Sequence, residues 1–180
     1  SGIICAIGGI GTFRTVPFLM EDAEFRDAVR QHPKFFLGYS DTTNNHFMLH
    51  RLGLQTFYGQ AFLPDLADLS GDMLPYSKAQ LESCFQPYHG RKITPAELWY
   101  EERTDFSESA LGTMPIARKE THGYELLQGS PVFEGSLLGG CIESMGEMLL
   151  SDSLAQYGDM LEPALKSCPQ LADDFAAQGD

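Results

Sequence analysis

The chain has 180 residues, 43% of them hydrophobic, and its 12 Lys and Arg residues face 25 Asp and Glu residues. The formal net charge of -13 argues against nucleic acid and anionic membranes as partners. No apolar segment approaches the ~20 residues needed to span a bilayer, and no signal peptide opens the chain, so we expect a soluble cytoplasmic protein. Its four cysteines lack metal-ligand spacing, which fits a reducing compartment.

Two apolar runs, each ending in glycine or small polar residues, indicate buried parallel strands in the first third of the chain. We expect the first strand to be covered on both faces. The predicted elements in order are a strand at 3–7, a helix at 17–30, a strand at 35–37, a helix at 41–52 that stops at Gly53, and a strand at 55–58. This alternation is typical of a doubly wound α/β sheet.

Past Gly59 the alternation is lost, because prolines and glycines interrupt the pattern repeatedly. One helix is predicted at 77–85. The aromatic and turn-rich text from 92 to 134 predicts short strands and loops, and a further helix is predicted at 142–150. The acidic tail from 151 to 180 carries only a weak pattern.

The segment around Ser40 reads as a strand, a tight turn and a helix, with a serine at the apex. A serine on such a turn projects its hydroxyl from the backbone, towards a group held by the amides that begin the next helix. Gly38-Tyr39-Ser40-Asp41-Thr42 matches only half of the G-x-S-x-G elbow, because Thr42 replaces the second glycine. Two interpretations stay open: Ser40 is the nucleophile of a serine hydrolase, or Ser40, Asp41 or Thr42 caps the helix.

The glycine turn at Gly8-Gly9 should emerge at the same edge of the sheet as the serine turn, because both follow parallel strands. Amides at this turn and at Asp41 could together form an oxyanion hole. A dinucleotide-binding loop is the competing interpretation, and Arg14 at the position of the third glycine disfavours it. Arg14 could hold a substrate carboxylate or be a charge on a helix surface.

Six segments carry a resemblance to one enzyme family. They read GGIGTFR, GYSDTTNNHFMLHRLG, TFYGQAF, WYEERTDF, GYELLQG and EGSLLGGC, and they extend from about Ile3 to Ile142. In these motifs the chain resembles the LD-carboxypeptidase family of serine peptidases, which includes the microcin C self-immunity peptidases. The long aromatic insert around Trp99 is more similar to the microcin-immunity branch.

The resemblance implies roles for particular residues. Ser40 would be the nucleophile, and the amides of Gly9 and Asp41 would form the oxyanion hole. Trp99 would stack on a substrate nucleotide, although a half-buried aromatic residue in a strand fits the sequence equally well. With Arg14, it is a candidate substrate-binding residue.

The resemblance also implies an α/β fold, with a flavodoxin-like parallel-sheet domain at 1–90, incomplete at its start, and part of a β-rich domain at 91–180, incomplete at its end. The family triad is Ser-Glu-His, and its Glu and His would follow the turn at Gly140. Only 40 residues follow Gly140, and no histidine follows His122. We therefore expect a fragment, or a short relative, that lacks its general base.

None of the five histidines is a clear substitute for that base. His46 and His50 share a helix face at a spacing that also suits a metal pair, but the Glu of H-E-x-x-H is missing. His122, in a predicted loop, is the one to test.

The predicted activity is amide hydrolysis through an acyl-enzyme on Ser40, with no metal and no organic cofactor. The predicted substrates are murein peptides ending in a D-amino acid, as for an LD-carboxypeptidase, or a peptidyl-nucleotide such as processed microcin C. The alternative is a catalytically inactive fragment that binds a ligand or a partner. Because missing strands would expose apolar edges, the chain could form a homodimer.

Overall fold

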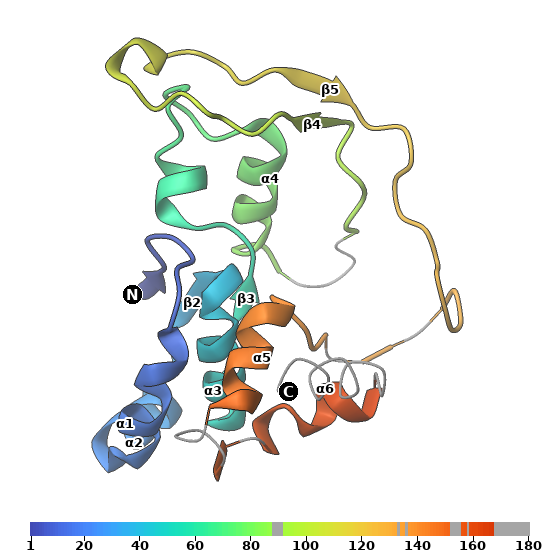
Figure 1. Cartoon of the computed structure of the whole chain (residues 1–180). Coiled ribbons are helices and arrows are strands. Elements are labelled where there is room, and N and C mark those ends of the chain that lie inside the picture. Colours follow the sequence, from blue (N-terminus) through green and yellow to red (C-terminus); the bar gives the residue numbers. More distant parts are fainter. Residues whose placement is uncertain (88–91, 133, 136, 152–155, 158, 168–180) are drawn as a thin grey trace. The chain divides into compact units, whose positions relative to one another are not determined.

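The computed structural model describes residues 1–87, 92–132, 134–135, 137–151, 156–157 and 159–167. The chain divides into two compact units, Ser1–Phe62 with Leu137–Asp180 and Leu63–Ser136, and each is described by its described residues (Figure 1). The boundary predicted between residues 90 and 91 lies outside the described residues, and the division into domains there stays a prediction.

The first unit is α/β and contains most of the regular structure. In chain order its elements are β1 (Gly2–Ile4), a 3-10 turn (Thr12–Thr15), α1 (Val16–Glu21), α2 (Ala23–Gln31), β2 (Phe35–Gly38), a 3-10 turn (Ser40–Thr42), α3 (Thr43–Arg51), β3 (Phe57–Tyr58), α5 (Ile142–Leu150) and α6 (Glu162–Ser167).

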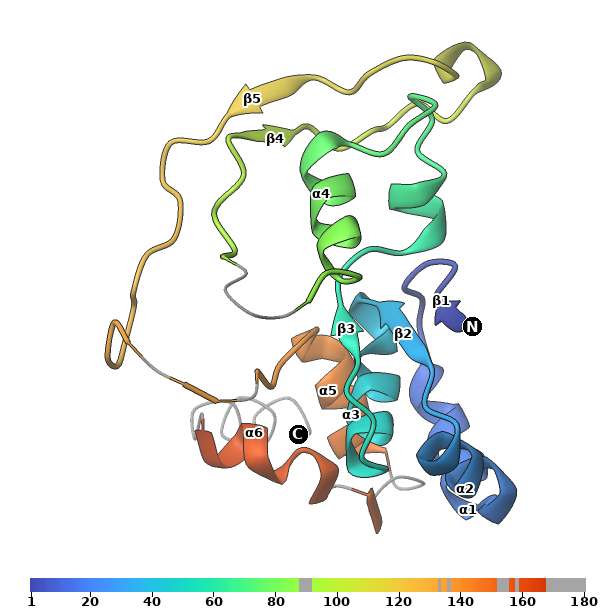
Figure 2. The ribbon, with the colours of Figure 1, turned by 180° about the vertical axis from the view of Figure 1, so that it is seen from behind.

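The three strands form a parallel sheet in the order β1-β2-β3, which confirms the predicted α/β class (Figure 2). Ile3 pairs with Phe36, and Leu37 pairs with Phe57. The first strand is shorter than predicted and is not covered on both faces, since Ile3 is 53% exposed. The reason is its place as the outer strand of the described sheet: among the described residues β1 pairs with β2 alone, and one further bond, from Cys5 N to Leu37 O at 2.9 Å, extends the ladder.

The predicted helix at 17–30 is two helices, because Asp22 interrupts it. Asp22 has extended backbone angles, and its carboxylate accepts hydrogen bonds from the amides of Glu24 and Phe25 at 2.8 and 3.1 Å. This is an N-cap, which begins α2 afresh. α2 then ends at Gln31, directly before His32-Pro33, as predicted.

Helix α3 ends as the sequence indicates. Gly53 has φ of +90°, and its amide donates to His50 O at 2.9 Å. The next amide, of Leu54, donates to Leu49 O at 2.9 Å. The two bonds form a Schellman motif, for which a glycine in the left-handed region is the favoured residue.

The core of the first unit combines residues from its N-terminal and C-terminal segments. Helix α5 contacts α3, and the two lie side by side in Figures 1 and 2. The buried cluster comprises Val16, Phe36, Phe47, Met48, Leu49, Met145, Met148, Met160 and Leu161.

The second unit contains α4 (Pro75–Ser83), β4 (Leu98–Tyr100), a 3-10 turn (Glu108–Ala110) and β5 (Ala117–Lys119), and a π-helical turn (Phe62–Leu66) leads into it. β4 and β5 pair antiparallel. The largely buried Arg103 connects two segments of this unit, with an ion pair to Asp68 at 3.7 Å and a hydrogen bond to Thr113 O at 2.7 Å. No helix among the described residues is long and apolar enough to cross a membrane.

Candidate active site

Ser40 lies at the apex of the turn between β2 and α3. Tyr39 is extended, with φ of -151°, and Ser40 then has φ of 58°. Ser40 is the only non-glycine residue with positive φ in the described part of the chain. For a serine this conformation costs on the order of 1–3 kcal/mol, and such residues cluster at active sites. The turn therefore has the geometry expected of a nucleophile elbow.

The glycine and threonine that flank Ser40 have clear packing reasons. A Cβ at Gly38 would lie 2.7 Å from Cys5 Sγ and 2.8 Å from Thr42 Oγ1. Thr42, in place of the elbow's second glycine, donates its hydroxyl to Tyr39 O at 2.8 Å. Neither the 3-10 turn nor α3 has a side-chain capping hydrogen bond. Thr42 occupies the N-cap position of α3, but no side chain of Ser40, Asp41 or Thr42 makes a capping hydrogen bond, so side-chain capping does not explain these residues.

The structure brings the glycine turn directly against Ser40, as the order of the strands predicts. A Cβ added at Gly8 would lie 2.8 Å from both Cβ and Oγ of Ser40, so only glycine fits there without a shift. Gly9 has φ of +139°, and its own Cβ would lie 3.6 Å from Asp41 Oδ2. The residues predicted to form an oxyanion hole, Gly9 and Asp41, thus flank the serine from two separate turns.

The Asp41 carboxylate ties these two turns together. Its side chain is 2% exposed, and Oδ2 accepts the Thr12 amide at 2.9 Å and the Thr12 hydroxyl. Asn44 Nδ2 approaches Oδ1 at 3.4 Å. A buried carboxylate needs such donors, because burying it without them is costly. Asp41 therefore fixes the end of the glycine turn relative to Ser40.

A third segment, at the start of α5, completes the surroundings. A Cβ at Gly140 would lie 2.5 Å from the Thr43 side chain, and the Cys141 amide donates to Thr43 Oγ1 at 3.0 Å. Further along α5, burial raises the pKa of Glu147, and the negative charge of Asp41 raises it further, while Arg14 lowers it. The segment from Gly139 therefore packs on the first turn of α3 and adds a carboxyl group near Asp41.

Tyr58, at the end of β3, is a site residue that the sequence did not single out. Its hydroxyl accepts a hydrogen bond from the Ser40 amide at 2.8 Å and lies 3.2 Å from Thr43 Oγ1. One signal was available, since Tyr58 ends a predicted parallel strand and so belongs to the sheet edge that carries Ser40. Thr12 and Thr43 were missed as well, because their partners are set by tertiary contacts.

His46 is a structural histidine of α3 and neither a base nor a metal ligand. Its Nε2 lies 3.0 Å from Gly38 O, so this nitrogen carries the proton and donates it. Nδ1 therefore accepts the Thr56 hydroxyl at 2.6 Å. Burial lowers the pKa of His46, and the bond to the Gly38 carbonyl offsets part of this effect. With both nitrogens engaged, the metal-pair interpretation with His50 fails.

The remaining described histidines are not placed as the base of Ser40. Among the described residues, Ser40 Oγ makes no hydrogen bond to a histidine. His32 and His50 are exposed, His89 lies outside the described residues, and His122 is an exposed residue of the second unit. The role of His122 stays a prediction. No group of three or more potential metal-ligating His, Cys, Asp or Glu side chains is found in the described ranges.

The two predicted substrate-binding residues belong to different units. Arg14 is exposed in the turn that begins at Thr12, and its guanidinium lies 5.6 Å from the centre of the Phe13 ring. Trp99 is the middle residue of β4, 49% exposed, and pairs with Arg118 of β5. Their roles stay predictions.

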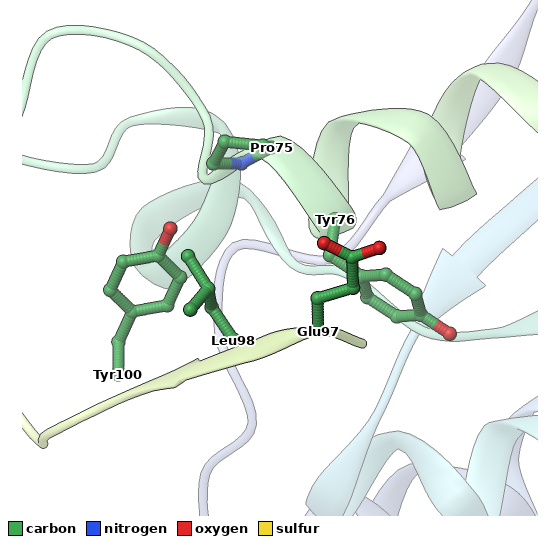
Figure 3. Close-up of a pocket in the computed structure, with 5 residues that line it drawn as sticks. All are labelled: Pro75, Tyr76, Glu97, Leu98 and Tyr100. Carbon is green, nitrogen blue, oxygen red and sulfur yellow. The ribbon is translucent and has the colours of Figure 1, made fainter. Parts of the chain in front are cut away.

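A pocket of about 300 Å³ lies on the face of β4 that carries Leu98 and Tyr100. Leu98 and Tyr100 line it together with Glu97, Pro75 and Tyr76 (Figure 3). Because side chains alternate along a strand, Trp99 belongs to the opposite face of the β4–β5 pair. An indole that is half exposed on this face has a free surface on which a planar ring could stack.

Comparisons with known proteins find relatives over much of the chain. Residues 1–59 match the LD-carboxypeptidase N-terminal domain. A probable murein peptide carboxypeptidase of Bacillus subtilis is 38% identical over 85 residues, which are 47% of this chain and 24% of that protein. The microcin C7 self-immunity protein MccF of Escherichia coli is 27% identical over 168 residues, covering 88% of this chain and 45% of that protein.

A solved structure is similar over most of the chain. The MccF-like protein from Streptococcus pneumoniae, crystallised in complex with AMP, superposes with a TM-score of 0.73 and 44% sequence identity, covering 89% of this chain and 46% of that chain. The chain thus spans less than half the length of each of these relatives. These similarities show that residues 1–59 belong to the LD-carboxypeptidase N-terminal domain family and that the chain is similar to MccF-like proteins over most of its length.

Proposed function

We propose that Ser40 is the nucleophile of a serine peptidase and that the amides of Gly9 and Asp41 bind the oxyanion. The observation that carries this proposal is the left-handed backbone of Ser40 at a strand-to-helix turn, with Gly8 packed against its side chain. Ser40 Oγ attacks the carbonyl carbon of an amide while a base removes its proton, and the amine leaves with a proton. Water then hydrolyses the acyl-enzyme.

The mechanism also requires a general base. By the family pattern a glutamate and a histidine complete the triad, and His122 is the histidine of this chain to test. Since no described histidine is bonded to Ser40 Oγ, a second candidate function is a catalytically inactive domain that binds a ligand or a partner.

Two substrate classes are proposed, both small and both containing an amide near a chain end. The AMP in the Streptococcus pneumoniae structure favours a peptidyl-nucleotide such as processed microcin C. Trp99 would stack on its base, as exposed aromatic side chains do in nucleotide-binding proteins. The Bacillus subtilis relative favours murein peptides ending in a D-amino acid. Arg14 would bind a substrate carboxylate through its planar guanidinium.

A fluorophosphonate probe tests the nucleophile, because it reacts covalently with activated serines. We expect the folded chain to be labelled at Ser40, with the adduct located by peptide mass spectrometry. Ser40→Ala should abolish labelling. Ser109→Ala, at an exposed serine of the second unit, is the matched control and should be labelled like the parent chain.

The absence of labelling in a chain with an intact far-ultraviolet circular dichroism spectrum would contradict the catalytic proposal for this chain. It would favour the binding alternative, which equilibrium binding of AMP can then examine.

A further inference from the structure

We propose that Tyr58 is a positioning residue for Ser40, because its hydroxyl closes a ring of hydrogen bonds that holds Ser40 in its left-handed conformation. This inference goes beyond the assignment of Ser40 as nucleophile. Its consequence for the reaction rate rests on that assignment, while the ring itself rests on distances between atoms of the first unit.

The ring joins both backbone polar groups of Ser40. The Ser40 amide donates to Tyr58 Oη at 2.8 Å, and Thr43 Oγ1 donates to Ser40 O at 2.5 Å. The two hydroxyls lie 3.2 Å apart. The peptide groups on both sides of the Ser40 Cα are therefore held by side chains of other residues.

The direction of each hydrogen bond follows from counting protons. A threonine hydroxyl has one proton, and in Thr43 it goes to Ser40 O, which can only accept. Thr43 Oγ1 also accepts the Cys141 amide at 3.0 Å. In its contact with Tyr58, Thr43 must then be the acceptor and Tyr58 the donor. The circuit closes: Ser40 N–H to Tyr58 O–H, to Thr43 O–H, to Ser40 C=O.

The ring of hydrogen bonds gives partners to backbone groups at a strained turn. The first amides of a helix have no partner within the helix, and a left-handed serine is strained besides. Tyr58 supplies the acceptor for the Ser40 amide, so loss of the Tyr58 hydroxyl would leave that amide without this acceptor. In a ring each hydroxyl donates and accepts at once, which strengthens the individual bonds.

The Tyr58 side chain is itself held in place from two sides. Its backbone pairs in register with Gly38, so β3 delivers it beside the residues that precede the turn. The His46 ring packs on it with a centroid distance of 5.1 Å. Tyr58 is 48% exposed while Thr43 is fully buried, so the ring of hydrogen bonds extends from the surface of the first unit into its interior.

Three variants test the ring. Tyr58→Phe removes one hydroxyl and keeps the aromatic ring, and Thr43→Val removes the other with little change in shape. Thr43→Ser restores a hydroxyl at the same position. Tyr157→Phe, at a tyrosine that packs on the core of the same unit, is the matched control.

The first readout is hydrogen exchange of the Ser40 amide, measured by NMR, which does not depend on activity. We expect exchange about tenfold faster in Tyr58→Phe, as for the loss of one hydrogen bond. Thr43→Val should also speed exchange, because the ring is then open, while Thr43→Ser and Tyr157→Phe should match the parent chain.

The second readout is fluorophosphonate labelling of Ser40, resolved into the maximal labelling rate and the probe concentration at half that rate. We expect Tyr58→Phe to lower the maximal rate about tenfold with an unchanged half-saturating concentration. Loss of fold stability alone would not lower the maximal rate while leaving the half-saturating concentration unchanged. It would also not explain why Thr43→Ser behaves like the parent chain.

The outcomes separate this proposal from the assignment of the nucleophile. If the parent chain is not labelled, the nucleophile assignment fails, and amide exchange alone decides on the ring. If Tyr58→Phe leaves both the exchange of the Ser40 amide and the labelling rate at parent values, the ring is overturned, while Ser40 can remain the nucleophile.

Discussion

At the scale of single residues, the candidate site is built from close approaches that only particular side chains permit. Ser40 adopts an unfavourable backbone conformation. The residues around it form hydrogen bonds that hold this conformation, and glycines beside it leave room for its side chain. Asp41 is the clearest example, since its buried carboxylate points away from its own turn, towards the glycine turn, and accepts both the amide and the hydroxyl of Thr12. Helix capping, the commoner role of such a residue, is absent from this described turn.

The close approach of Gly8 to Ser40 predicts the effect of a single methyl group. In Gly8→Ala the new Cβ would lie 2.8 Å from Ser40 Oγ, so Ser40 has to move. We expect fluorophosphonate labelling at least about tenfold slower, because small displacements of a nucleophile are costly. Gly139→Ala is the control, since a Cβ there meets no atom within 4 Å and φ lies outside the left-handed region. Equal labelling of both variants would show that the glycine turn does not constrain Ser40.

At the scale of elements, α3 connects the site to the sheet through a buried polar side chain. His46 spans from the carbonyl of Gly38 to the hydroxyl of Thr56 and packs edge-on against Phe36 at 5.1 Å. It thereby joins the end of β2 to the residues before β3. Because the His46 side chain can be protonated, the packing of α3 depends on the protonation state of His46.

The sign of that dependence follows from the pKa of His46, which burial lowers below its ordinary 6.5. The unfolded chain then binds the proton more readily than the folded chain. The stability contributed by neutral His46 is fully present above 6.5 and is lost as the pH falls below it, through the folded pKa. Urea midpoints between roughly pH 7.5 and pH 5 should fall less steeply in His46→Gln than in the parent chain. His50→Gln, at an exposed position of α3, should keep the parent slope.

At the scale of the whole molecule, the first unit depends on residues far apart in the sequence. Its core takes Phe47, Met48 and Leu49 from α3, and Met145 and Met148 from α5. The sheet contributes less burial on its outer side, where the β1 residues are exposed. Self-association through this outer strand stays a prediction.

One core methionine tests the contribution of α5. Met148 is fully buried, so Met148→Ala should lower the free energy of unfolding by about 2–5 kcal/mol, measured by urea denaturation. Met114→Ala, at a residue of the second unit that is 58% exposed, should change it by less than about 0.5 kcal/mol. Unfolding of Met148→Ala at the same urea concentration as the control would show that α5 is not part of the folded core.

Local signals in the sequence predicted much of the first unit. Apolar runs predicted β1 and β2, His32-Pro33 and Gly53 predicted where two helices end, and the helix at 142–150 was predicted with the bounds that α5 has. Each of these depends on residues only a few positions apart. The break at Asp22 is also local, but its carboxylate was counted among the acids of one helix and not as a cap.

By itself the sequence thus determined the α/β class, the serine turn and the family, because periodicity and contiguous motifs carry that information. Only the tertiary structure decided what surrounds Ser40. Thr43 meets Cys141 across 98 positions, and Tyr58 reaches the Ser40 amide across 18. His46 changed from a candidate ligand to a buried connector, because its partners come from two strand ends. Contacts of this kind follow from strand order and helix packing, which no local pattern records.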